Sequence, residues 1–117
     1  MPMKTVTALS ADSKRKLRVP IVSQVGAFSV AKGVDLRPGI RKLAPYWVVY
    51  HTRSGCSMGE GFRAKKDALK MLGFVGKMPG NWDQDVTLIR NSTALQATFR
   101  EVWMQGLCEL GIYKRLG

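Results

Sequence analysis

Aromatic and β-branched apolar residues fill the first part of the run 46–53, which is rich in Tyr, Trp and Val and ends at the dipeptide Ser54-Gly55. A second run, 56–63, follows the dipeptide directly. Runs rich in such residues and bounded by a turn dipeptide are typical of strands, and a glycine supplies the positive φ that a two-residue turn requires. The sequence therefore predicts a β-hairpin over these residues.

A two-residue turn at Ser54-Gly55 fixes the expected register of this hairpin, with Arg53 opposite Cys56 and Trp47 opposite Phe62. The side chains then divide between two faces. The larger and more apolar face should point to the core: Trp47, Val49, His51, Met58 and Phe62. The other face carries two tyrosines and two glycines: Tyr46, Val48, Tyr50, Thr52, Ser57, Gly59, Gly61 and Arg63. It is either a surface on which bases stack or a layer covered by a C-terminal helix.

Two segments carry a helical pattern. The first, 64–73, has good helix formers with Gly73 or Gly76 placed to end it. In the second, apolar residues recur at steps of three and four from Leu95 to about Leu110, after Asn91 or Ser92 as a cap. This longer amphipathic helix should pack on the sheet, form a dimer interface, or both.

The remaining segments are less regular. Residues 19–34 are rich in Val, Ile and Phe and predict a first strand, bent at Gly26, and 85–90 predicts a short strand. Pro and Gly at high density make 33–45 a basic loop. Residues 1–18 are basic, with few large apolar groups, and we expect a flexible basic arm there.

These elements together predict an α+β fold in a single domain over 19–117, preceded by the arm over 1–18. The expected architecture is a small antiparallel sheet of three or four strands. A short basic helix follows the hairpin, and the C-terminal amphipathic helix packs on the sheet.

Charge changes the picture more than composition does. The chain has 117 residues and a formal net charge of +11, from 19 Lys and Arg against 8 Asp and Glu. Residues 1–45 hold nine basic and two acidic side chains, 46–78 hold six and two, and 79–117 hold four of each. An excess confined to the first two thirds favours one electropositive surface and a polyanionic partner.

We expect the two cysteines, Cys56 and Cys108, to be reduced thiols, since they lie far apart in sequence. The chain starts with no secretory signal pattern and has no apolar run long enough to span a membrane. We therefore expect a cytoplasmic protein without a membrane partner.

Candidate chemistry is sparse. His51 is the only histidine, and a catalytic pair with Cys56 would need the thiol and the imidazole within hydrogen-bond reach. Asp83 and Asp85 could hold Mg²⁺ in a nuclease, but two carboxylates in a turn are a weak signal. No Gly-Lys-Ser/Thr sequence follows the glycines, and the chain lacks four zinc ligands. We expect no enzyme activity, no metal and no cofactor.

The leading hypothesis is a non-enzymatic nucleic-acid-binding protein, small and regulatory or accessory, with duplex DNA favoured over RNA. The predicted contacts are the basic residues of the arm, the loop and the hairpin-helix, with two tyrosines: Lys14, Arg15, Lys16, Arg18, Arg37, Arg41, Lys42, Tyr46, Tyr50, Arg53, Arg63, Lys65 and Lys66. The alternative is a compact inhibitor or adaptor whose basic face docks on an acidic or nucleic-acid-processing protein. In that case an exposed Trp82 loop and the C-terminal helix would carry the contacts, the helix also serving a possible homodimer.

Overall fold

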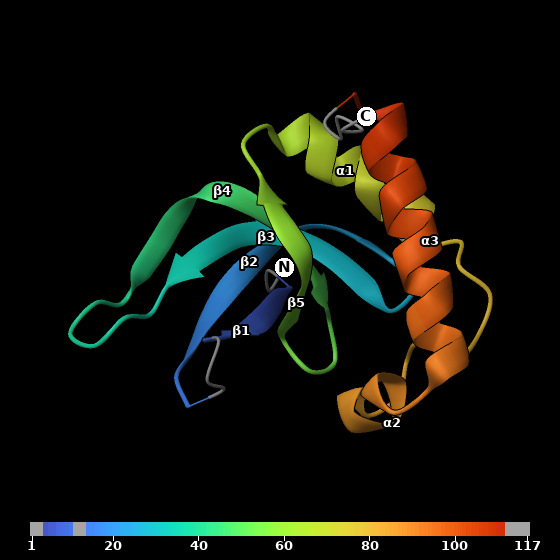
Figure 1. The fold of residues 1–117 in the computed structure, drawn as a ribbon. Coiled ribbons are helices and arrows are strands. Elements are labelled where there is room, and N and C mark those ends of the chain that lie inside the picture. Colours follow the sequence, from blue (N-terminus) through green and yellow to red (C-terminus); the bar gives the residue numbers. More distant parts are fainter. Residues whose placement is uncertain (1–3, 11–13, 112–117) are drawn as a thin grey trace.

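The computed structural model describes residues 4–10 and 14–111. Its centre is one antiparallel sheet of five strands, whose order along the sheet follows the chain (Figure 1). The strands are β1 (Thr5–Leu9), β2 (Lys16–Val25), β3 (Phe28–Asp35), β4 (Lys42–His51) and β5 (Cys56–Phe62). Three helices follow: α1 (Lys65–Val75), α2 (Val86–Arg90) and α3 (Thr93–Glu109). The α+β class is confirmed, although the sheet has more strands than the predicted three or four.

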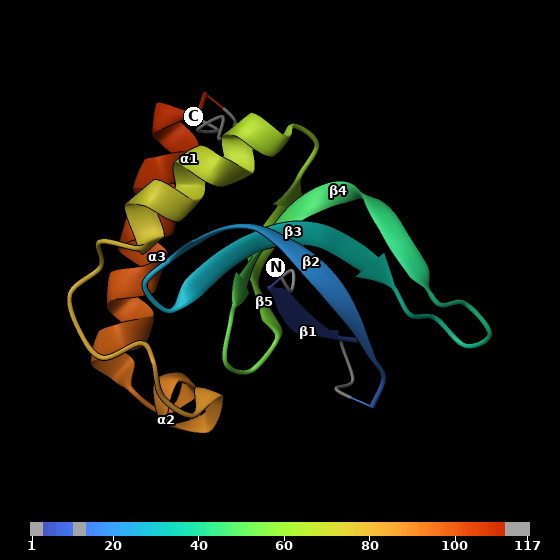
Figure 2. The ribbon, with the colours of Figure 1, turned by 180° about the vertical axis from the view of Figure 1, so that it is seen from behind.

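The sheet is curled into an open trough. Its two edge strands approach each other where the Leu9 N–H donates to the Gly55 carbonyl at 3.1 Å. Away from this point the β1–β2 and β3–β4 hairpins diverge, as both views show (Figures 1 and 2). The curvature gives the sheet a concave face between the hairpins and a convex face that carries the helices.

The first core lies between the convex face and the helices. Val49 and Phe62 from the sheet are buried with Met71 and Leu72 of α1 and Trp103 of α3. The five residues predicted to face the core are all on this side: Val49 and Phe62 are buried in it, Trp47 and Met58 pack against it, and His51 is buried beside Phe28. The C-terminal helix therefore covers the convex face and leaves the tyrosine face to another element.

That element is the N-terminal strand. Val6 and Ala8 of β1 are buried on the concave face with Val19, Val48 and Tyr50. Burial of alternate residues of one strand is the pattern of a sheet with one covered face. The second core thus fills one end of the trough.

This arrangement differs from the predicted arm over 1–18. Residues 5–9 are strand β1, and Lys16, Leu17 and Arg18 already belong to β2. The physical reason is that Thr5–Leu9 alternates apolar and hydroxyl side chains, so the strand buries one face despite the basic residues around it. Residues 1–3 and 11–13 of the predicted arm lie outside the described residues.

Two other segments also differ from their predictions. The segment 19–34 is two strands, because Gly26 adopts φ 59° and allows a tight turn rather than a bend. The segment 85–90 is helix α2, because the Asp85 carboxylate accepts a hydrogen bond from the Thr87 N–H and caps it.

The hairpin of β4 and β5 exists, but its turn has four residues. His51 pairs with Cys56, and the Gly55 N–H donates to the His51 carbonyl at 2.8 Å. The predicted pairing of Arg53 with Cys56 is therefore wrong. A bulge in which Gly59 has φ 70° restores the predicted pairing of Trp47 with Phe62.

Both predicted helices are confirmed. Helix α1 ends at Gly76, and α3 starts after Ser92, whose Oγ accepts from the Leu95 N–H at 3.2 Å. Within residues 4–10 and 14–111, no helix has both the length and the apolar character needed to span a membrane.

Candidate nucleic-acid interface

A pocket of about 560 Å³ opens on the concave face, beside the second core. Both diverging hairpins, β5 and the end of α2 contribute to its wall. The lining residues are Leu9, Ser10, Arg15, Gly33, Val34, Asp35, Leu36, Arg37, Tyr46, Val48, Tyr50, Cys56, Ser57, Gly59, Gly61 and Arg90. Three arginines, two tyrosines and three glycines therefore meet in one cavity.

The two tyrosines have different roles. Tyr50 is 2% exposed, and its hydroxyl donates to the Lys32 carbonyl at 2.9 Å, so it is a core residue at the floor. Burial raises the pKa of Tyr50 well above its ordinary value, which keeps the hydroxyl protonated. Tyr46 is 37% exposed and offers its ring to solvent.

Two glycines determine how the Tyr46 ring lies. A Cβ added at Gly33 or at Gly61 would collide with ring atoms of Tyr46. The ring therefore lies directly against the backbone of β3 and β5. A ring packed against the sheet backbone in this way, and still partly exposed, can stack on a second planar group.

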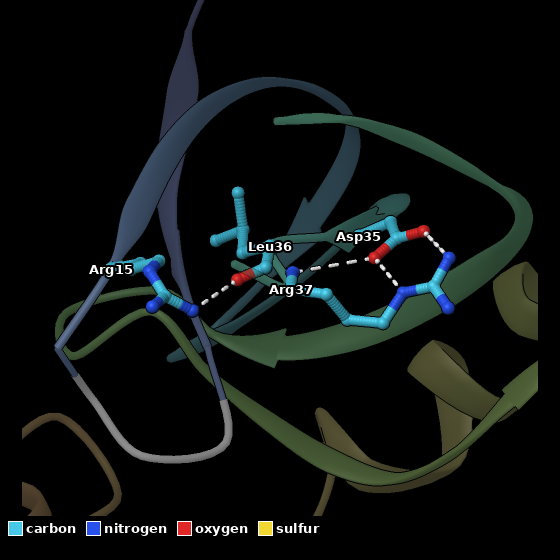
Figure 3. A network of polar contacts seen from close by, with 4 residues as sticks. All are labelled: Arg15, Asp35, Leu36 and Arg37. Atoms are coloured by element: carbon cyan, nitrogen blue, oxygen red, sulfur yellow. Dashed lines mark hydrogen bonds and ion pairs between the residues drawn. The ribbon is translucent and has the colours of Figure 1, made fainter. Parts of the chain in front are cut away.

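Arg15 joins the two hairpins at the pocket rim. Its Nη1, just before β2, donates to the Leu36 carbonyl, just after β3, at 2.9 Å (Figure 3). Arg37 makes a two-pronged ion pair with Asp35, through Nε and Nη2 at 2.9 Å each (Figure 3). The hydrogen bonds from the Arg37 side chain hold the pKa of Asp35 below its ordinary value. The charge of Arg37 is thus largely balanced, whereas that of Arg15 is not.

Arg90 was absent from the predicted contacts. It ends α2, and its Nη2 lies 3.6 Å from Cys56 Sγ, which is a weak contact for a guanidinium. Among the described residues the only ion pair joins Asp35 and Arg37, so Arg90 has no carboxylate partner there. The sequence pattern missed Arg90 because it predicts a short strand over 85–90, and such a strand gives no reason to place Arg90 beside the hairpin.

The pocket brings together only four of the thirteen predicted contacts, Arg15, Arg37, Tyr46 and Tyr50. On β2, Lys16 and Arg18 alternate with Leu17 and Val19, which belong to the second core on the concave face. The side chains of Lys16 and Arg18 therefore point to the opposite face of the sheet from the pocket.

The other predicted residues lie around the pocket. Lys14 is exposed just before β2, and Arg41 and Lys42 follow the β3–β4 loop, where Lys42 lines a second hollow with Tyr46. Arg53 donates to the Asp83 carbonyl at 3.2 Å in the β4–β5 turn. Arg63, Lys65 and Lys66 are exposed where β5 leads into α1.

The arrangement of the described residues supports neither a Cys-His catalytic pair nor a metal site. Both ring nitrogens of buried His51 are engaged, Nδ1 with Ser54 Oγ at 2.8 Å and Nε2 with the Trp82 carbonyl at 2.6 Å, so no Cys56-His51 pair forms. Asp85 is the α2 cap, and the described part of the chain holds no group of three metal-ligating side chains. Trp82 is 5% exposed, which removes the exposed contact proposed for an adaptor.

Comparison of the chain with protein-family models, with curated proteins and with solved structures found no match.

Proposed function

We propose that this protein is a non-enzymatic nucleic-acid-binding protein that takes an unpaired nucleotide of a single strand into the concave pocket. The observation that carries the proposal is the meeting of three side chains in one cavity: Arg15 and Arg90, neither paired with a carboxylate among the described residues, and the partly exposed ring of Tyr46. Guanidinium groups recognise phosphate, and an aromatic ring stacks on a base.

The shape of the pocket favours a single strand over the duplex that charge alone suggested. Tyr46 lies within a concave surface walled by both hairpins, and a duplex keeps its base faces stacked inside the helix. Only an unpaired base has a free face for the ring. A volume of about 560 Å³ is also in the range of pockets that hold one small organic ligand.

Each group has a definite contribution in this proposal. Stacking on Tyr46 supplies about 1–3 kcal/mol and is tolerant of base identity. Arg15 and Arg90 neutralise phosphate and give the binding its salt dependence, with a slope of roughly 0.7 per phosphate for a single strand. The basic residues outside the pocket add further sequence-independent contacts along the backbone.

The test is a fluorescence-anisotropy titration with a single-stranded oligonucleotide and the matching duplex across salt concentrations. We expect the single strand to bind more tightly, and Arg90→Gln and Tyr46→Ala to weaken it about tenfold each. Arg100→Gln is the matched control, because Arg100 is exposed on α3 and outside the pocket. Duplex binding as tight as single-strand binding, with Arg90→Gln and Arg100→Gln alike, would refute the proposal.

A further inference from the structure

Two lysines lie over one tryptophan on the opposite face of β4 from the pocket. The Nζ atom of Lys32 is 4.7 Å from the centre of the Trp47 ring, and that of Lys65 is 5.5 Å away. Trp47 is half-buried, paired with Lys32 on β3 and with Phe62 on β5. The sequence pattern placed Trp47 in the core and did not single out Lys32.

The arrangement concentrates positive charge without a counter-charge. Neither ammonium group forms an ion pair with a carboxylate among the described residues, where the one ion pair is Asp35–Arg37. The indole ring attracts each cation but does not neutralise it, and the two cations repel each other. Two ammonium groups held beside one ring are a site for a bound anion.

The cluster of Lys32, Trp47 and Lys65 is connected to the pocket by a path around the edge of the sheet at β5. β5 is an edge strand, and Gly61 near its end lines the pocket. Two residues further on is exposed Arg63, and Lys65 then begins α1, close to Trp47 in the middle of β4. A polymer leaving the pocket over Gly61 therefore meets Arg63 and then the lysine cluster.

From this geometry we infer a second nucleic-acid subsite, in which Lys32 and Lys65 bind the backbone phosphates of a single strand that wraps around the β5 edge from the pocket. The inference rests on the proposed function, because the pocket holds the first nucleotide. The ligand class is a phosphodiester chain. Trp47, which lies near both ammonium groups, would report the arrival of the chain through its emission.

The wrapped path makes a prediction about strand length. A strand of about 4 nucleotides places one nucleotide in the pocket without reaching the lysine cluster, whereas one of about 12 reaches both subsites. Lys32→Gln and Lys65→Gln keep the side-chain stems and remove the charges. Each should weaken the longer strand about fivefold at 0.1 M salt and leave the shorter one unchanged. Together they should lower the salt slope for the longer strand by about 1.4.

The experiment titrates wild type and the double variant Lys32→Gln/Lys65→Gln with both strands, and follows intrinsic tryptophan emission with Trp47→Phe as the assignment control. Lys70→Gln on α1 is the matched charge control, since Lys70 is exposed and outside the cluster. Circular dichroism checks that each variant folds.

Weakening confined to the longer strand, together with a binding-dependent emission change that Trp47→Phe removes, supports the second subsite. Equal binding of the longer strand by the double variant and by Lys70→Gln overturns it and means that the lysines only shield the indole. That result leaves pocket binding of the shorter strand intact, so it is distinct from failure of the proposed function, in which neither strand responds to Arg90→Gln.

Discussion

Replacing Tyr50 with Phe tests whether Tyr50 is a buried core residue at the floor of the pocket. The substitution keeps the ring that packs with Val6 and Val48 and removes only the hydroxyl that donates to the Lys32 carbonyl at 2.9 Å. Loss of one buried hydrogen bond costs about 1 kcal/mol of unfolding free energy. At neutral pH we therefore expect Tyr50→Phe to be less stable than wild type by about this amount.

The stability difference between wild type and Tyr50→Phe should shrink in alkali. Burial raises the pKa of Tyr50 above its ordinary value of 10.0, so the folded protein keeps this hydroxyl protonated while the unfolded chain ionises it. The contribution is fully present below pH 10 and is lost as pH rises beyond it, by about 1.4 kcal/mol for each pH unit. Near pH 11 wild type and Tyr50→Phe should therefore be about equally stable.

The assay is urea unfolding followed by tryptophan emission at pH 7, 9, 10 and 11, because Trp82 and Trp103 are buried and report on the first core. Ser92→Ala is the control, because it removes one hydrogen bond of similar expected cost and no group that titrates in alkali, so its stability difference from wild type should stay constant from pH 7 to 11. A stability difference between wild type and Tyr50→Phe that stays constant from pH 7 to 11 would refute the assignment of Tyr50 to a buried floor.

Three further substitutions test other parts of the fold. Ser92→Ala removes the cap that accepts from the Leu95 N–H and should cost about 1 kcal/mol, read from the thermal midpoint. His51→Leu leaves the buried Trp82 carbonyl without its donor and should cost about 1–3 kcal/mol in urea unfolding. The hydrogen bond from the Thr87 N–H is the main reason that the pKa of Asp85 lies below its ordinary value of 3.8. The charged Asp85 therefore stabilises the fold above pH 3.8, and this stabilisation is lost as pH falls through the lowered pKa. In acid unfolding curves, the stability difference between wild type and Asp85→Asn should shrink below about pH 4.

Each of these three has an outcome that would contradict its reasoning. An unchanged midpoint for Ser92→Ala would mean that water satisfies the Leu95 N–H equally well. Wild-type stability in His51→Leu would mean that the Trp82 carbonyl is not dependent on the imidazole. A gap between wild type and Asp85→Asn that persists undiminished at pH 2 would mean that the carboxylate charge does not stabilise α2.

Local patterns predicted the parts of the fold that local forces determine. The α3 helix follows from its three- and four-residue apolar spacing and a cap at Ser92, and both are features of the sequence itself. The core face of the β4–β5 hairpin also followed from alternation, with Trp47 and Phe62 paired as expected. The turn did not, because a four-residue loop and a bulge at Gly59 compensate each other in register.

Tertiary contacts decide what the sequence left open. Val6 and Ala8 form a strand only because the concave face of the sheet is there to bury them, and five residues are too few to predict against a basic background. Arg90 reaches the pocket because the short capped helix α2 returns the chain to the hairpin. The β-branched residues of that segment favour a strand instead, so the sequence pattern does not predict the helix. The candidate site was therefore half predictable: Tyr46 came from the sheet pattern, and Arg90 from the fold.

The most direct test of single-strand binding in the pocket is an amide chemical-shift titration of the labelled protein with a short oligothymidine strand. The account predicts that the largest shifts fall on Gly33, Tyr46, Ser57 and Gly61, which line the pocket, while Gly73 and Gly111 on the helical side stay unchanged. Shifts confined to the helices, or none at strand concentrations that saturate binding, would contradict it.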